Sequence, residues 1–217
     1  HHGYVPRMKA AVSALGHDPA TCHMIIHQLV HLFRGTTPVK MSKRAGEFVT
    51  LREVMEEVGT DACRFFFAQR TADAHLNFDL DLAKKKSSEN PVFYCQYVHA
   101  RVCSIFKEGI KAGVIQAGER LHPVPELFRE REERAILITL AWFPEFLKVS
   151  ERDLSPHQLA AYLLELAGLF HAFYEEHRVV DIAEPRLSQA RLALCEGVKN
   201  VMAEGLGLLG VSTPQEM

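Results

Sequence analysis

Apolar residues recur at helical spacing through the second half of the sequence. One stripe runs along residues 91–112, and others follow in residues 159–174 and 187–206. Another apolar stretch, AILITLAWF, reaches Pro144, which we expect to kink or divide its helix just after Phe143. Together these stretches predict a bundle of about four helices. The expected core positions include Tyr94, Val98, Val102, Ile105, Phe106, Leu163, Leu166, Phe170, Phe173, Leu194 and Val198, while Gln96, Arg101 and Lys107 lie off their stripe.

The first half of the sequence mixes short helices with strands. Residues 4–15 predict a helix that Gly16 ends. Residues 25–33 and 39–41 predict two strands, because the segment RGTTP between them has the composition of a hairpin turn. The polar stretch AKKKSSEN then predicts an exposed joint before the helical half.

Two local signals mark helix starts in the first half. Thr50 and Glu53 have the spacing of a capping box, in which each side chain accepts a hydrogen bond from the other residue's backbone amide. Asp79 and Asp81 alternate with apolar residues and could form a pair of catalytic carboxylates. Capping of the next helix by Asp79 is the commoner use of such a residue, and we favour it.

Composition favours a globular protein in a reducing compartment. The 217 residues are 47% hydrophobic, enough for a sizeable core, and five cysteines form an odd set without a CxxC pair. We therefore expect a cytoplasmic protein, and we find no apolar run long enough to cross a membrane and no signal peptide. A net charge of -2 means that any nucleic acid must bind a local basic patch.

His23, His27 and His31 are spaced four residues apart and would share one face of a helix or a strand. Such spacing suits a metal site, but no carboxylate or cysteine stands nearby at ligand spacing. We favour polar surface positions for the three histidines and predict no metal site.

The segment VKMSKRAGEFVTL at residues 39–51 concentrates cationic and hydroxyl side chains around Gly46. Lys40, Lys43 and Arg44 would repel one another without an anion to face, so the segment suits a phosphate-binding loop. On charge alone, a solvated basic loop is the commoner interpretation.

The letters KMSKR resemble the signature loop of class I aminoacyl-tRNA synthetases. Further segments resemble the arginyl-tRNA synthetase family in the same order: HHGYVPR, FVTLREV, VGTDACRFFF, NFDLDLA, ENPVFYCQYVHAR, LAAYLLELAGLFHAFYEEHRVV and GLGLLGVSTPQEM. The resemblance covers the whole chain, and it depends on the set of segments rather than on the loop alone. One departure is Glu47, where the family more often has asparagine or aspartate.

This resemblance implies a mainly α fold, in which the end of a Rossmann-type catalytic fold and the KMSKR loop precede an α-helical bundle. Residues 1–38 would end the nucleotide-binding fold, residues 39–85 would hold the loop and connecting helices, and residues 86–217 would form the anticodon-binding domain. The parent would be an arginine-tRNA ligase that uses ATP and Mg²⁺ to join arginine to its tRNA, and we expect a monomer without membrane contact.

The resemblance also implies site residues. Lys43 would stabilise negative charge on the ATP phosphates with support from Lys40 and Ser42. The ATP-binding set would be Lys40, Met41, Ser42, Lys43 and Arg44, with His1 and His2 as the tail of a further motif. For stacking on unpaired tRNA bases, the candidates are Tyr97, Arg101, Tyr174, Arg178 and Met217.

The family's HIGH-like histidine motif is not found in these residues. We therefore expect a carboxy-terminal fragment that alone neither activates arginine nor charges tRNA. Two alternatives remain open at this point: a non-catalytic tRNA-binding module, and a helical protein-interaction domain unrelated to RNA. Salt-dependent binding to tRNA separates the last from the others.

Overall fold

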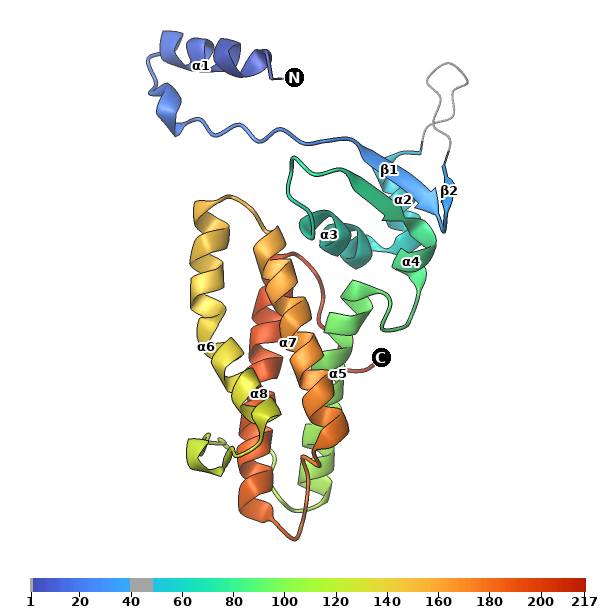
Figure 1. Cartoon of the computed structure of the whole chain (residues 1–217), viewed down its shortest axis with the longest axis vertical. Helices are drawn as coiled ribbons and strands as arrows, with labels where there is room; N and C mark the ends of the chain where they lie inside the picture. The colour runs from blue at the N-terminus through green and yellow to red at the C-terminus, as the bar shows by residue number, and fades with distance from the viewer. Residues whose placement is uncertain (1, 40–48) are drawn as a thin grey trace.

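The computed structural model describes residues 2–39 and 49–217 (Figure 1). A small sheet with its helices forms one end of the molecule, and four long helices form the other. None of the described helices combines the length and the apolarity needed to cross a membrane. In chain order the elements are α1 (Tyr4–Ala14), η1 (Pro19–Thr21), β1 (Val30–Arg34), β2 (Thr37–Pro38), α2 (Leu51–Val58), α3 (Thr60–Ala68), β3 (Leu76–Asp79), α4 (Leu80–Lys84), α5 (Pro91–Lys111), η2 (Pro125–Leu127), α6 (Arg131–Arg152), α7 (His157–Glu176) and α8 (Pro185–Leu208).

The sheet has the strand order β2-β1-β3. β1 and β2 form the predicted antiparallel hairpin, with Arg34 opposite Thr37. β1 and β3 run parallel, with Val30 opposite Leu76, and the chain crosses between them through α2 and α3. A parallel pair joined by helices is the connection of α/β nucleotide-binding folds. The mainly α fold class with a remnant of a Rossmann-type sheet is confirmed.

The strand boundaries differ from those predicted. Residues 25–29 are extended but unpaired in the sheet, and Ile25 and Leu29 are exposed, so β1 begins only at Val30. The second strand covers Thr37–Pro38 rather than residues 39–41, of which 40 and 41 lie outside the described part of the chain. An apolar run alone could not show where a neighbouring strand would pair with it.

Helix starts follow the local signals closely. Thr50 Oγ1 accepts the backbone N–H of Glu53, whose carboxylate accepts the N–H of Thr50, so the predicted capping box is confirmed. Asp79 caps α4, as predicted, by accepting the backbone N–H groups of Asp81 and Leu82. At the joint before α5, Asn90 caps the helix and donates its side-chain amide to the carbonyls of Ala83 and Lys85.

The four-helix bundle of α5, α6, α7 and α8 is confirmed, and its core contains the predicted stripes. Phe170, Phe173 and Val198 are fully buried. At Gly205 of α8 an added Cβ would lie 2.6 Å from Leu163 Cδ2 of α7, so a residue without a side chain lets the two helices approach closely.

The prediction at Pro144 was wrong in one respect. The proline does not divide the helix, because α6 continues from Arg131 to Arg152. The flanking Phe143 and Phe146 both pack on Tyr162 of α7, with ring centroids 5.6 and 4.8 Å away, and this packing offsets the hydrogen bond that proline cannot donate. Gln96 lies off the apolar stripe, as expected, but it is buried against Asp61 and Ser212.

One ion pair in the bundle is almost entirely out of water. Arg191 Nε of α8 lies 2.7 Å from Glu133 Oε1 at the start of α6, and Glu133 is fully buried. Glu133 Oε2 also accepts the N–H of Glu130, while Arg191 Nη1 donates to the carbonyl of Arg178. This pair therefore joins three segments of the bundle.

We expect Arg191→Met to lower the free energy of unfolding by about 3 kcal/mol, because it leaves the Glu133 carboxylate buried without a partner. Urea denaturation measures the loss, and Arg186→Met, at an exposed arginine on the same helix, is the control. Adding Glu133→Gln to Arg191→Met should restore part of the stability. If Arg191→Met alone were as stable as the unmodified chain, the buried Glu133 carboxylate would not need Arg191 as its partner.

Glu57 links α2 to the sheet. Its carboxylate accepts two hydrogen bonds from Arg34 of β1, at 2.5 and 2.8 Å, and one of 2.8 Å from Lys84 of α4. The bonds from Arg34, then those from Lys84, lower the pKa of Glu57 from 4.5 to about 2. A carboxyl group with a depressed pKa stabilises the folded state above pH 4.5 and loses that contribution as the pH falls toward 2.

Glu57→Gln should therefore lower stability at pH 7 by about 0.5–1 kcal/mol, a modest effect because solvent screens these partly exposed groups. The difference from the unmodified chain should shrink as the pH falls from 4.5 toward 2. Thermal unfolding across this range measures it, with Glu56→Gln at an exposed neighbour as the control. A difference that stays constant with pH would contradict the role of the charge.

Candidate nucleic-acid interface

Helices α5 and α7 together present a row of aromatic rings and one guanidinium group. On α5, Phe93, Tyr97 and Arg101 are spaced four residues apart, so they share one face of the helix. His171 and Tyr174 of α7 are three residues apart and face them. We call this set, with Tyr94, the aromatic ladder: Phe93, Tyr94, Tyr97, Arg101, His171 and Tyr174.

Three rings of the ladder, those of Phe93, Tyr97 and His171, lie nearly parallel. The Phe93 and Tyr97 centroids are 6.1 Å apart with an interplanar angle of 20°, and those of Tyr97 and His171 are 5.9 Å apart at 23°. Arg101 Cζ lies 4.9 Å from the Tyr97 centroid and 5.1 Å from that of Tyr174, so its guanidinium bridges the two helices. Arg101 also donates a hydrogen bond to the Tyr97 hydroxyl. These contacts hold flat side chains in fixed orientations.

Two open hollows lie along the ladder. The first, of about 430 Å³, is lined by Ser88, Glu175 and four members of the ladder, namely Phe93, Tyr94, Tyr97 and His171. His171 Nε2 is buried and has no hydrogen-bond partner among the described residues. The second hollow, of about 330 Å³, begins at Tyr174 and continues along the segment that follows α7. The ladder is thus accessible to a ligand from both ends.

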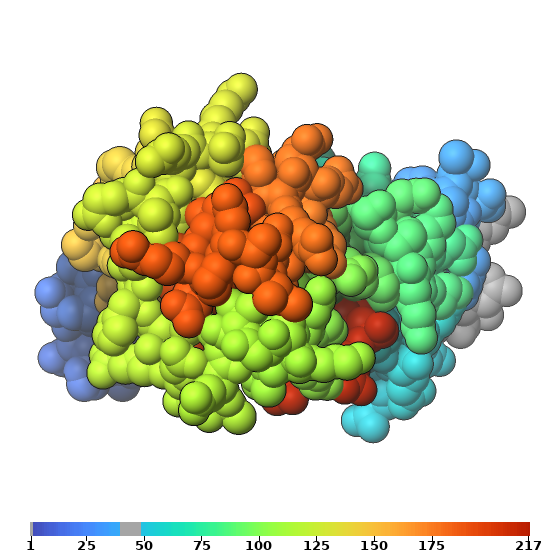
Figure 2. Space-filling view, turned by 90° about the horizontal axis from the view of Figure 1, so that it is seen from below, coloured from blue at the N-terminus to red at the C-terminus, as the bar shows by residue number. Residues whose placement is uncertain are grey.

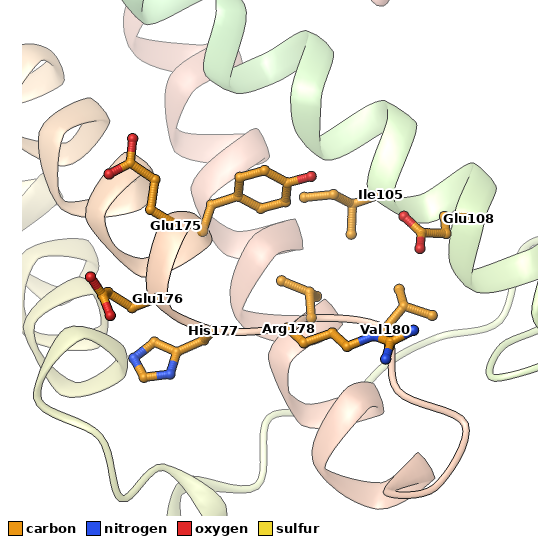
Figure 3. A pocket seen from close by; sticks show the side chains of 9 residues that line it. Ile105, Glu108, Glu175, Glu176, His177, Arg178 and Val180 are labelled. Carbon is orange, nitrogen blue, oxygen red and sulfur yellow. Dashed lines mark hydrogen bonds between the residues drawn. The ribbon is translucent and has the colours of Figure 1, made fainter.

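Carboxylates surround the second hollow. Figure 3 shows Glu175 and Glu176 on α7 at one side and Glu108 on α5 at the other, with Arg178 below them. Arg178 Nε donates to the carbonyl of Val180, which holds this side chain close to its own loop. Carboxylates repel phosphates but accept hydrogen bonds from the amino groups of bases, so the surface suits bases better than a sugar–phosphate backbone.

The structure brings four of the five predicted tRNA-binding residues to this region. Tyr97, Arg101 and Tyr174 belong to the ladder, and Arg178 lines the second hollow. Met217 lines neither hollow and is 51% exposed at the end of the chain. These placements do not test binding, so the assignment of each residue to tRNA stays a prediction.

The ATP-binding prediction falls almost entirely outside the described residues. His2 is exposed ahead of α1. The remaining predicted ATP-binding residues lie outside the described part of the chain: His1, Lys40, Met41, Ser42, Lys43 and Arg44. The predicted phosphate-binding and catalytic roles of these residues therefore stay predictions.

Sequence reasoning missed two members of the ladder and placed a third differently. Phe93 and His171 carried no signal of their own, although the i, i+4 spacing of Phe93, Tyr97 and Arg101 could have indicated a shared face. Tyr94, expected in the core, is only half-buried, and its ring lies 4.4 Å from that of His171.

His23, His27 and His31 are all exposed. In the part of the chain that the structure describes, the potential metal-ligand atoms that come close together belong instead to Glu130, Glu132 and His177. His177 Nε2 lies 3.1 Å from Glu132 Oε2, and this contact holds the pKa of Glu132 below its usual range. The pair ties the start of α6 to the end of α7.

The sequence profile of the DALR anticodon binding domain matches residues 95–217, which include most of α5, all of α6, α7 and α8, and four members of the ladder. The chain belongs to the DALR anticodon binding domain family. The DALR domain therefore contains Tyr97, Arg101, His171 and Tyr174, while Phe93 and Tyr94 lie just before its matched region.

The chain is also similar over its whole length to longer proteins. The chain is 54% identical over 217 residues to arginine–tRNA ligase of Elusimicrobium minutum and 50% identical to that of Desulforudis audaxviator, covering 40% and 38% of their lengths. The chain thus spans well under half of the curated relatives that it matches. It is also similar to a solved structure from Campylobacter jejuni assigned as an arginyl-tRNA synthetase, at 32% identity and a TM-score of 0.83 over 100% of this chain and 46% of that one. Arginyl-tRNA synthetase of Thermus thermophilus shares the fold at 24% identity, with a TM-score of 0.70 over 96% of this chain and 38% of that one.

Burial lowers the pKa of His171 below its ordinary 6.5, because the ring sits among the aromatic side chains of the ladder. We expect an NMR titration of the chain to place this pKa below 6.5, and Tyr97→Ala to move it upward by exposing the ring to water. The exposed His122 provides a reference resonance in the same spectra. A His171 pKa that does not respond to Tyr97→Ala would mean that the ladder does not shield the ring.

Proposed function

We propose that these 217 residues are the carboxyl-terminal part of an arginine–tRNA ligase and that the aromatic ladder receives unpaired bases of the tRNA anticodon. The observation that carries the proposal is the position of the ladder: four of its six members lie within the matched DALR domain, on the surface between α5 and α7. The high identity to arginine–tRNA ligases along the whole chain supports arginine tRNA as the partner.

The physical argument is one of stacking. Single-stranded RNA is read by bases that leave their own stack and pack on aromatic rings or guanidinium planes. Tyr97 and His171 present nearly parallel rings, and Arg101 adds a charged plane beside them. Each stacked base contributes about 1–3 kcal/mol. In the first hollow, Glu175 can accept a hydrogen bond from the edge of such a base, and His171 Nε2 can pair with it.

The activity of the longer protein is part of the same proposal. It would activate arginine with ATP and Mg²⁺ and transfer it to tRNA, with Lys43 stabilising charge on the phosphates and Lys40 and Ser42 in support. The 217 residues alone would bind tRNA without charging it. A monomeric protein in the cytoplasm, without membrane contact, completes the proposal.

A titration of the 217-residue chain with labelled arginine tRNA tests the anticodon assignment. We expect a transcript with a substituted anticodon to bind about 10- to 100-fold more weakly, because the wrong base loses the hydrogen bonds that its edge makes with Glu175 and His171, worth about 1–3 kcal/mol. Tyr97→Ala and Arg101→Met should each weaken binding of the natural transcript by about 10-fold and reduce its discrimination against the altered one. Binding should also weaken as salt rises.

The chain offers a matched control for these variants. On α1, Arg7 Cζ lies 5.4 Å from the centroid of the exposed Tyr4 ring, a contact of the same chemistry as that of Arg101 and Tyr97. Tyr4→Ala and Arg7→Met should leave tRNA affinity unchanged. Equal affinity for both transcripts would refute the anticodon assignment, and binding that is absent at every salt concentration would favour a protein-interaction domain.

A further inference from the structure

The residues that follow α8 pack back along the molecule. Gly210, with φ of +68°, turns the chain out of the helix, and Val211 is buried. An added Cβ at Gly210 would lie 2.6 Å from a guanidinium nitrogen of Arg64 on α3. We call residues 211–216 the carboxyl-terminal strap. In Figure 2 the red carboxyl-terminal residues lie between the green residues of α5 and the cyan residues that precede α3.

Asp61, in the first turn of α3, connects three distant segments. Its Oδ1 accepts the backbone N–H of Ser212 at 3.2 Å, and its Oδ2 accepts the Ser212 hydroxyl. Oδ2 also accepts Gln96 Nε2 of α5 at 2.8 Å, and the same nitrogen lies 2.9 Å from the carbonyl oxygen of Ser212. The strap, α3 and α5 thus meet in one hydrogen-bonded group.

Two further contacts extend the strap along α5. His99 Nδ1 lies 2.9 Å from the carbonyl oxygen of Pro214, which can only accept, so the ring nitrogen donates. Glu216 pairs with Lys107 at the surface. Gln96 and His99 are both buried, and buried polar groups are costly unless they are hydrogen-bonded. The strap supplies the partners that these two side chains require.

Helix α3 also carries the sheet end of the molecule. It follows α2 after the single residue Gly59, and α2 is held to β1 and α4 through Glu57. The capping box at Thr50 fixes the start of α2. The junction of α3, α5 and the strap therefore lies between the sheet and the bundle that bears the ladder.

We propose that the carboxyl-terminal strap fixes the orientation of the sheet and its α2–α3 pair on the DALR bundle, with Asp61 and Gln96 as positioning residues. Helix α3 contacts α5 and α7 of the bundle, while its Phe66 packs on Phe78 of β3, so α3 keeps the two parts in contact. The directional hydrogen bonds of the strap select one angle between them. This inference concerns the junction alone and holds whether or not the ladder binds tRNA.

Hydrogen exchange measured by mass spectrometry tests the junction in the 217-residue chain. In the double variant Gln96→Met/Ser212→Ala, we expect amides of α3 and of the strap to exchange about 10-fold faster or more, with α6 and α7 unaffected. Gln189→Met is the matched control, because Gln189 is another half-buried glutamine that donates to a backbone carbonyl, that of Val114, elsewhere in the bundle. In Ser212→Thr, which keeps the hydroxyl, the amides of α3 and the strap should exchange at the same rate as in the unmodified chain.

Orientation itself is measured by the distance distribution between two spin labels. Arg52→Cys on α2 and Glu165→Cys on α7 provide exposed attachment sites, after Cys22 and Cys103 are replaced by alanine. We expect a broader distribution in Gln96→Met/Ser212→Ala than in the labelled parent or in the Gln189→Met control. An unchanged distribution in a folded variant, or exchange that rises equally throughout the bundle, would overturn the proposal and leave only a general contribution to stability.

Binding of an isolated arginine anticodon stem-loop separates this inference from the proposed function. The strap variants should bind the stem-loop within about twofold of the unmodified chain, because the ladder and the junction share no residue. Stem-loop binding lost only in the strap variants would contradict the proposal, since the strap would then belong to the binding surface. Binding absent from the unmodified chain would count against the proposed function without affecting the orientation measurements.

Discussion

The rotational setting of helix α5 is the constraint on which most of this structure depends. One side of the helix buries Val98 and Val102 in the bundle core, and another places Gln96 and His99 against the strap. A third side carries Tyr97 and Arg101. Successive residues of an α-helix are about 100° apart, so a shift of one residue would misplace all three sets at once. The core, the junction and the ladder therefore fix the same helix in the same position.

Features encoded by neighbouring residues could be predicted from the sequence. The capping box of Thr50 and Glu53 and the cap at Asp79 involve partners within three positions. The local sequence is therefore sufficient to predict these helix caps. The stripes of the bundle are equally local, because helical periodicity reports which face is buried. Gly16, which ends α1, has a φ of +82° that suits glycine.

Features that depend on distant partners could not be predicted in this way. The burial of Gln96 could not be predicted, because its partners, Asp61 and Ser212, lie 35 and 116 positions away. Pro144 follows the rule for a helix breaker, yet packing on α7 outweighs the lost hydrogen bond. His171 and Phe93 are aromatic residues among many, and only the approach of α5 to α7 distinguishes stacking at the surface from packing in the core. The resemblance to a family indicated which half of the chain matches the DALR domain but not the arrangement of its rings.

The strap also determines the order in which this molecule can be completed during synthesis. Asp61 bonds to Ser212, 151 residues later in the chain, whereas the hairpin of β1 and β2 pairs residues that are only a few positions apart. Contacts of such high sequence separation form late, because the intervening chain must first lose its freedom. A ribosome that has produced the sheet and the first three helices of the bundle still lacks the last residues of the junction. The strap can therefore lock the sheet end to the bundle only after Ser212 has been synthesised.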